Sequence, residues 1–272
     1  MPILSLSAVN FPQQSFTMSD KKTTGKLKKV LVFLAVLLFW TGVWQGVFML
    51  VGKEILVVSP AQVAGKMLVL VRESYFWQSI GMTFLRISTG YISGVLLGTL
   101  CAVLTVAVPF LKTLLYPLIS LVKATPVASF IILALVWIKK DGVPVFITFL
   151  IVFPIIWANV SEAVVNTDKG LLEMAKAFSL SRLSIVKNIY LHSVLPYFAA
   201  GCTTAIGLAW KAGVAAEVIA MPRSSVGYNL YRSKINIETA DLFAWTIVVI
   251  VLSVILERFI VFLLGKIKRE AK

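Results

Sequence analysis

Few side chains in this sequence have the types and spacing that covalent chemistry needs. His192 is the single histidine, and the two cysteines, Cys101 and Cys202, each lie among apolar residues. These positions fit neither a metal-ligand spacing nor a disulfide framework, and no nucleophile has a general base at a recognisable spacing. A phosphate-binding loop of the form GxxxxGK[ST] is also missing from the sequence. The sequence therefore predicts no catalytic residue, no metal site and no cofactor bound by this chain.

The charged residues inside long apolar stretches are the stronger functional candidates, because a charge in a membrane span is costly. Lys211 follows Trp210 on a stretch of small residues. We expect Lys211 to face a central cavity and to favour an anionic group of a substrate, with a structural ion pair to Glu217 or Glu162 as the alternative. The candidate residues of a translocation pathway are Lys123, Trp210, Lys211 and Glu217.

These residues belong to a chain of 272 residues, of which 59% are hydrophobic and 14% charged. Soluble domains average about 45–50% apolar and about 25% charged residues, so the composition excludes an ordinary soluble enzyme. The net charge of +14 would suggest a nucleic-acid partner in a soluble protein. Here the basic residues flank apolar stretches, as is typical of helix ends beside anionic lipid. We expect a lipid bilayer, and not nucleic acid, around this chain.

Six stretches are apolar and long enough to cross a bilayer, which takes about 20 residues. Lys123 and Pro126 interrupt the third, for which a short interfacial helix followed by a span from about Thr125 is the alternative. The prediction is an all-α, polytopic membrane helical bundle with six transmembrane helices. The stretches cover residues 30–51, 82–108, 116–138, 143–164, 194–221 and 242–264.

The ends of the chain are expected on the cytoplasmic side, because that orientation places more Lys and Arg inside than outside. The first stretch is too long for a signal peptide and lacks a cleavage site after it, so it should remain as a helix. Residues 1–24 are expected to be flexible and without function, and Met18 is an alternative start to Met1. The membrane domain then covers residues 25–272.

Small residues recur at every fourth position of two predicted spans, which keeps them on one face of each helix. In a bilayer such residues let helices approach closely. We expect packing within the chain, with a dimer contact or a moving helix contact as the alternative. The positions are Gly90, Gly94 and Gly98 in the second span, and Gly201, Ala205, Ala209 and Gly213 in the fifth.

The segment 165–192, between the fourth and fifth spans, predicts two amphipathic helices at the cytoplasmic surface. Asp168 can cap the first by accepting a hydrogen bond from a free amide, and Ser181 can cap the second. An apolar face outside the bilayer needs a partner, so we expect this helix–turn–helix to dock onto another protein. That face carries Leu171, Leu172, Ala175 and Phe178, opposite Lys169 and Lys176.

This segment resembles the EAA loop of the permease subunits of bacterial ABC importers. The signature reads Glu-Ala-Ala, three residues, Gly, nine residues and Ile-x-Leu-Pro, and four positions match: Glu173, Ala175, Ile189 and Leu191. Three positions depart from it, since Met174, Ser179 and His192 replace Ala, Gly and Pro. Because serine adopts left-handed backbone angles at a cost of order 1 kcal/mol, a differently closed turn is expected at 179. Without the proline, the second helix can run on toward Pro196.

Three other stretches narrow the resemblance to the nitrate/sulfonate/taurine-type permeases, over roughly residues 30–265. They are LVKATPVASFIILALVW at 121–137, AAEVIA at 215–220 and SVGYNL from Ser225. The resemblance implies a type I ABC importer permease fold in the bacterial inner membrane. It also implies a second permease chain (a homodimer, or a heterodimer as the alternative), two ATPase subunits that hold ATP and Mg²⁺, and an extracytoplasmic solute-binding protein.

The same resemblance implies a transport subunit rather than an enzyme, for a small anionic or zwitterionic solute such as nitrate, a sulfonate, taurine or a vitamin precursor. The loop after the fifth span, with Arg223, Arg232 and Lys234 outward on a short helix, would receive the binding protein or cover the outer mouth. An ordinary solvated loop is the alternative. The alternative function is a self-contained secondary transporter that uses Lys211 and Glu217 in ion coupling. A membrane-embedded enzyme is the weakest of the three hypotheses. The residues that would couple to the ATPase are Leu172, Glu173, Ala175, Lys176, Phe178, Ser179 and Arg182.

Overall fold

The computed structural model describes the backbone of residues 20–270 and the side chains of residues 31–266. The chain divides into two units, residues 1–53 and 54–272. The described part of the first unit is a helix, α1 (Asp20–Val51), whose apolar stretch Leu31–Val51 is long enough to span a membrane and has no buried residue. Residues 20–24 of the segment expected to be flexible are helical, whereas residues 1–19, with both candidate start methionines, lie outside the described residues.

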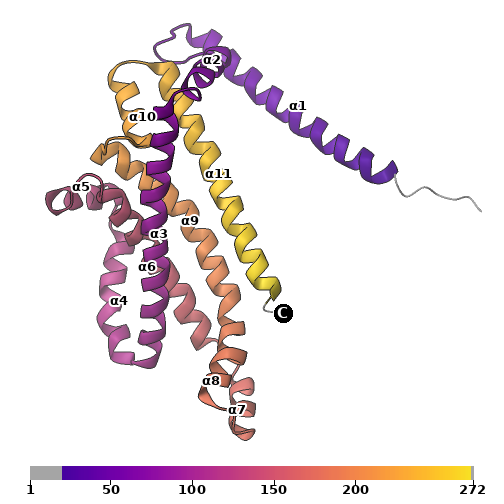
Figure 1. Ribbon diagram of the computed structural model, residues 1–272, viewed down its shortest axis with the longest axis vertical. Coiled ribbons are helices and arrows are strands. Elements are labelled where there is room, and N and C mark those ends of the chain that lie inside the picture. Colours follow the sequence, from indigo (N-terminus) through magenta and orange to yellow (C-terminus); the bar gives the residue numbers. More distant parts are fainter. Residues whose placement is uncertain (1–19, 271–272) are drawn as a thin grey trace, which may run out of the picture. The chain divides into compact units, whose positions relative to one another are not determined.

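The second unit is helical throughout its regular elements (Figure 1). Short helices flank the long ones at both ends of the bundle, and a π-helical turn, η1, joins α8 to α9 without a break. The elements are α2 (Pro60–Leu70), α3 (Ser74–Ala107), α4 (Pro109–Ala124), α5 (Val127–Trp137), α6 (Val143–Val165), α7 (Lys169–Ala177), α8 (Arg182–Ile185), η1 (Val186–Tyr190), α9 (Leu191–Ala220), α10 (Val226–Ile235) and α11 (Thr239–Glu270).

Five of the six predicted spans appear in the described chain as helices of spanning length, in α1, α3, α6, the α8–η1–α9 run and α11. The third is different: α4 and α5 meet at an angle of 109°. Thr125 has extended backbone angles, φ −82° and ψ 133°, because the proline that follows disfavours the helical region for it. The prediction of one straight helix over residues 116–138 is therefore wrong. The helix is broken at Thr125, which is where the alternative prediction began its span.

The centre of the bundle is formed by α3, α6 and α9, with α6 packed against both of the others (Figure 1). The small residues allow this close approach. A Cβ atom on Gly94 would lie 2.7 Å from Cβ of Val152, and one on Gly98 would lie 2.9 Å from the carbonyl oxygen of Phe153. Gly213 is equally close to Ile87. The expectation of packing within the chain is confirmed.

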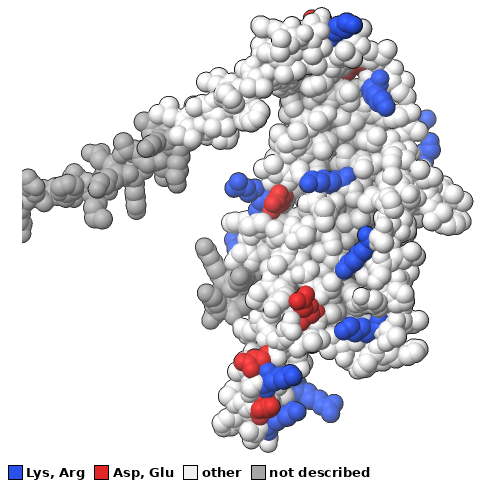
Figure 2. Space-filling view, turned by 180° about the vertical axis from the view of Figure 1, so that it is seen from behind, with Lys and Arg blue, Asp and Glu red and all other residues white. Residues whose placement is uncertain are grey.

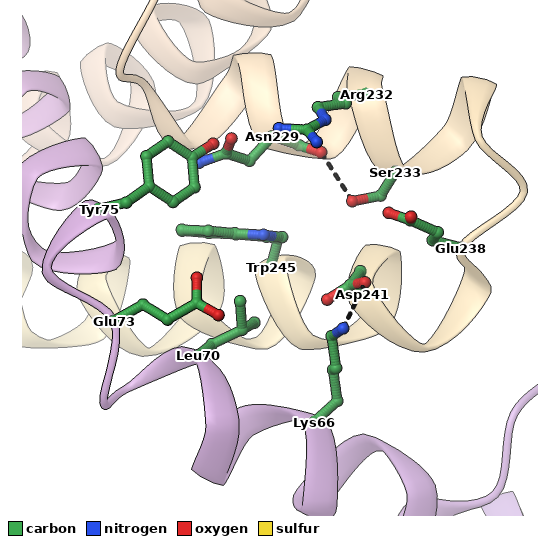
Figure 3. A pocket seen from close by; sticks show the side chains of 10 residues that line it. All are labelled: Lys66, Leu70, Glu73, Tyr75, Asn229, Arg232, Ser233, Glu238, Asp241 and Trp245. Carbon is green, nitrogen blue, oxygen red and sulfur yellow. Dashed lines mark hydrogen bonds and ion pairs between the residues drawn. The ribbon is translucent and has the colours of Figure 1, made fainter.

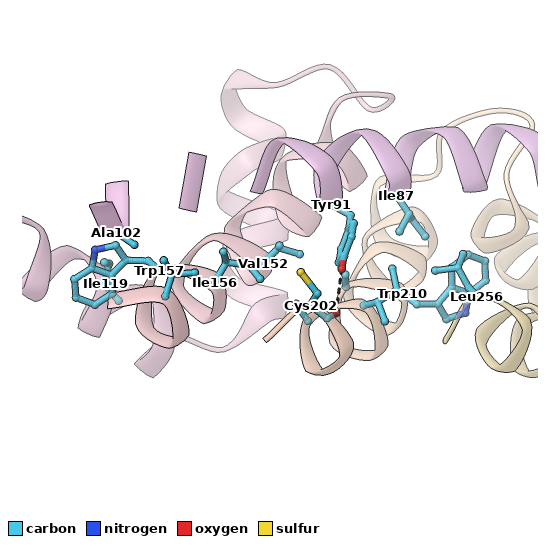
Figure 4. Close-up of a cluster of buried hydrophobic side chains, with 14 of the residues drawn as sticks. Ile87, Tyr91, Ala102, Ile119, Val152, Ile156, Trp157, Cys202, Trp210 and Leu256 are labelled. Atoms are coloured by element: carbon cyan, nitrogen blue, oxygen red, sulfur yellow. Dashed lines mark hydrogen bonds between the residues drawn. The ribbon is translucent and has the colours of Figure 1, made fainter. Parts of the chain in front are cut away.

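Large buried side chains complete this core, and their polar atoms are paired (Figure 4). The Tyr91 hydroxyl donates to the carbonyl oxygen of Cys202 at 3.0 Å, and the Trp157 indole donates to the Thr105 hydroxyl at 3.1 Å. Trp210 donates to the carbonyl oxygen of Val249 at 3.1 Å and thereby connects α9 to α11. Burial without unpaired polar atoms makes these residues favourable packing elements.

Replacing Gly94 by alanine is expected to destabilise the protein by about 1–3 kcal/mol, because the new methyl group has no space against Val152. Gly81 lies on the same helix, and a Cβ there would have nothing within 4 Å. Gly81→Ala is therefore expected to be neutral or to stabilise by up to about 1 kcal/mol, through helix propensity. Thermal unfolding in detergent compares the two variants; equal shifts would contradict the close α3–α6 contact.

Candidate functional site

The helix–turn–helix at one end of the bundle begins with the two predicted caps. The Asp168 carboxylate accepts a hydrogen bond from the Gly170 amide at 2.7 Å, and the Ser181 hydroxyl accepts one from the Ser184 amide at 3.2 Å. Each cap satisfies a backbone amide that has no partner within its helix. Both capping predictions are confirmed, and α7 and α8 lie beyond the ends of α6 and α9 (Figure 1).

The turn between α7 and α8 closes as a glycine turn would, although the residue is a serine. Ser179 has φ +52°, in the left-handed region. Its amide donates to the carbonyl oxygen of Lys176 at 3.0 Å, and the Leu180 amide donates to that of Ala175 at 2.9 Å. This is the Schellman arrangement, which satisfies two free carbonyl groups. The expectation of a differently closed turn is wrong, because these bonds offset a backbone cost of about 1 kcal/mol.

The surface of the α7–α8 segment (residues 169–185) combines exposed apolar and charged side chains. Phe178 is 75% exposed and Leu183 is 78% exposed. Ala175 is buried and Leu172 is half-buried, whereas Glu173, Lys176, Ser179 and Arg182 are exposed. Figure 2 shows acidic and basic side chains gathered at this end of the molecule. Exposed apolar side chains at a polar end of a protein are candidates for contact with another molecule.

The α8–η1–α9 run joins this segment directly to the bundle. Helical structure continues from Arg182 to Ala220, a stretch of 39 residues, and passes through Pro196. His192, which replaces the proline of the signature, keeps its backbone amide, and the helix also accommodates Pro196 further on. The expectation that the second helix runs on is confirmed.

A buried polar network lies near the opposite end of the bundle and centres on Glu217, which is fully buried. The Thr83 hydroxyl donates to Glu217 Oε2 at 2.8 Å, and the Gly227 amide donates to the same atom at 3.2 Å. Arg86 Nη1 lies 3.4 Å from Glu217 Oε1. The carboxylate thus accepts hydrogen bonds from α3 and from the start of α10. The N-terminal end of a helix carries a partial positive charge, so the start of α10 also stabilises the negative charge of Glu217.

Arg86 extends the network to the loop between α5 and α6. Its side chain is only 6% exposed, and its Nη2 lies 2.6 Å from Oδ1 of Asp141, whose side chain is 72% exposed. The guanidinium also donates to the carbonyl oxygens of Arg223 and Ser224, at 3.2 and 3.3 Å. Arg86 was not among the candidate residues chosen from the sequence. The sequence feature that could have identified it is the one that identified Lys211, a charged residue inside an apolar stretch.

The four candidate pathway residues differ in burial. Lys123 and Lys211 are exposed, whereas Trp210 and Glu217 are buried inside the bundle. Glu217 pairs with Arg86 rather than with Lys211, because residues six apart on an α-helix point in different directions at 3.6 residues per turn. The alternative for Lys211, a structural ion pair with Glu217 or Glu162, is not found among the described residues.

The segment after α9 folds into α10, as predicted, with Arg223, Arg232 and Lys234 exposed. However, it is packed rather than solvated: the Asn229 side-chain amide donates to the Ser79 hydroxyl at 3.1 Å.

A pocket of about 200 Å³ lies between α10, α11 and the α2–α3 junction (Figure 3). In this pocket, Lys66 of α2 pairs with Asp241 of α11 at 3.0 Å, and Tyr75 lies edge-on to Trp245 with 6.5 Å between the ring centres.

Among the described residues, no group of His, Cys, Asp or Glu could hold a metal ion.

The family described as "binding-protein-dependent transport system inner membrane component" matches residues 94–269, more than half of the chain. The chain belongs to this family. It is a multi-pass membrane permease component of an ABC importer.

Named relatives agree with this assignment. The permease is 25% identical to a probable ABC transporter permease protein of Haemophilus influenzae, over 85% of this chain and 93% of that one. It is 26% identical to the nitrate import permease protein NrtB of Synechococcus elongatus, over 81% and 82% of the two chains. A match to the bicarbonate transport system permease protein CmpB of Synechocystis has 27% identity and covers 57% and 56%.

The fold of the permease is that of a type I ABC importer subunit. A chain of the MetNI methionine ABC transporter, solved in inward-facing conformations, superposes with a TM-score of 0.54. The match covers 76% of this chain and 98% of that one, at 21% sequence identity. The expected architecture is thereby confirmed.

Proposed function

We propose that the α7–α8 segment of this permease docks onto a separate ATPase subunit and couples ATP hydrolysis to transport. The observation that carries the proposal is the exposure of Phe178 and Leu183 at a charged end of the bundle. The contact would involve Leu172, Glu173, Lys176, Phe178, Ser179 and Arg182, whereas buried Ala175 would support α7 from behind. ATP and Mg²⁺ would be held by the ATPase.

The helical run from Arg182 to Ala220 supplies the mechanical connection for this coupling. At 1.5 Å per residue, the 32 residues from the end of the segment at Ile185 to Glu217 cover about 50 Å. A push on α7 and α8 would therefore move α9 as a rigid element and reach α3 and α10 through Glu217 and Arg86. Movement of this kind alternates access between the two sides of the membrane, with the substrate chemically unchanged.

The assembly would contain two permease chains, most simply two copies of this one, with two ATPase subunits and an extracytoplasmic solute-binding protein. Both termini and the α7–α8 segment would lie in the cytoplasm. The transported solute would be a small anion or zwitterion, since named relatives import nitrate and bicarbonate. Lys123 and Lys211 are exposed on the single chain and remain the candidates for a pathway between two copies.

Co-purification tests the docking proposal. The permease is isolated in mild detergent from its native host, and a P-loop ATPase is identified and quantified by mass spectrometry. Phe178→Ala is expected to reduce recovery of the ATPase at least tenfold, because an exposed aromatic side chain buried on docking contributes strongly to binding. Phe33→Ala is the matched control, since Phe33 is 66% exposed on α1. Equal recovery with both variants would contradict the proposal.

A further inference from the structure

A second pocket, of about 370 Å³, lies between the α5–α6 loop and the segment that precedes α10. Lys140 and Arg223 contribute two exposed cationic side chains, and Asp141 contributes a carboxylate. Met221, Pro222 and Tyr228 complete the lining. The elements that line it, the α5–α6 loop and the start of α10, lie away from the α7–α8 segment (Figure 1).

Arg86 stands directly behind this pocket. Its Nη2 contacts two of the lining residues, at 2.6 Å from Asp141 Oδ1 and 3.2 Å from the carbonyl oxygen of Arg223. On its other side, Nη1 faces the fully buried Glu217. The Arg86 guanidinium is thus held by Glu217 on the side of the bundle interior, and by the Asp141 carboxylate on the side that faces solvent.

The charge balance of the pocket favours a further anion. Glu217 offsets the charge of Arg86, so Lys140 and Arg223 face the single negative charge of Asp141. An excess of positive charge in a hollow attracts small anions from solution. Asp141 is largely hydrated in its present position, and an ion pair with such an exposed partner contributes little. A dissolved anion of the same shape can therefore displace it.

We infer that this pocket binds a small planar oxyanion, which replaces the Asp141 carboxylate on the guanidinium of Arg86. Asp141 accepts a single hydrogen bond from Arg86 Nη2, since the other Nη donors bond to Glu217 and to the carbonyl oxygens of Arg223 and Ser224. A charge-assisted bond of this kind is open to any small anion whose oxygen takes the place of the carboxylate oxygen. Nitrate, bicarbonate and small carboxylates all present such oxygens in one plane. Asp141 then acts as a resident competitor that leaves when the anion enters. The inference deepens the proposed function, because it rests on transport of a small anion and gives that anion an entry site.

Anion binding to the purified permease tests the inference. Nitrate, acetate and chloride are titrated at constant ionic strength, and the shift of the thermal unfolding temperature gives an apparent dissociation constant for each. Asp141→Ala is expected to bind nitrate and acetate at least tenfold more tightly than the wild type, because the competitor is gone. Adding Arg223→Gln to that variant is expected to reverse much of the gain.

Glu238→Ala is the matched control, since it removes one exposed negative charge but does not contact Arg86. The same nitrate affinity in Asp141→Ala and Glu238→Ala would overturn the inference, and so would a response to chloride equal to that to nitrate. Asp141→Asn, which keeps the shape of the side chain, takes the place of Asp141→Ala if the latter does not fold. ATPase recovery is measured separately, so that failure of anion binding is distinguished from failure of the docking proposal.

Discussion

Replacing Glu217 by alanine is expected to destabilise the permease by about 3–5 kcal/mol, because it leaves a buried guanidinium without its buried partner. The same change removes the acceptor for the Thr83 hydroxyl and the Gly227 amide. Three donors from two helices would then lose their bonds at once. The midpoint of unfolding in a denaturing-detergent titration measures the loss.

Two further variants separate the network from a general effect of removing a glutamate. Glu162→Ala changes an exposed residue of α6 and is expected to stay within about 0.5 kcal/mol of the wild type. The double variant Arg86→Leu, Glu217→Leu is expected to recover much of the loss, since an apolar pair often replaces a buried ion pair at little cost. A Glu217→Ala midpoint equal to that of Glu162→Ala would show that the network contributes little to stability.

Reversing the charge of Glu173 is expected to reduce solute uptake at least tenfold while leaving the bundle folded. Glu173 is exposed on α7, two residues before the buried Ala175, so lysine is accommodated without repacking. A like-charge contact in a docked interface costs several kcal/mol, and each 1.4 kcal/mol corresponds to about a tenfold change in binding. ATP hydrolysis by the assembled transporter would then proceed without matching uptake.

The control for this change is Glu162→Lys, which makes the same charge reversal on an exposed residue at the end of α6. Uptake and ATP hydrolysis are compared in vesicles that contain each variant with its ATPase and binding protein, and thermal unfolding confirms that both variants fold. Normal coupled uptake with Glu173→Lys would count against docking through α7. Loss of uptake with Glu162→Lys but not with Glu173→Lys would indicate that the ATPase contacts the end of α6 instead.

Much of the fold was predictable from local sequence, because membrane helices follow from composition and length. The apolar stretches predicted five of the spans, and the four-residue spacing of small residues predicted close contacts between helices. Asp168 and Ser181 predicted the N-terminal caps of α7 and α8. These features depend on neighbours within one or two turns. The turn at Ser179 shows the limit of local reasoning: two backbone hydrogen bonds, visible only in the folded chain, hold serine in a conformation that favours glycine.

The partners of the charged residues were decided by tertiary structure. The sequence alone establishes that a charge within an apolar helix needs a partner, and it singled out Lys211 and Glu217. It cannot say which residue supplies the partner, since Arg86 and Glu217 are 131 positions apart. Only the packing of α3 against α9 and α10 brings them together, and leaves Lys211 exposed. Sequence determined which residues span the membrane, while three-dimensional packing determined which charges are paired, because pairing depends on distance in space and not on distance along the chain.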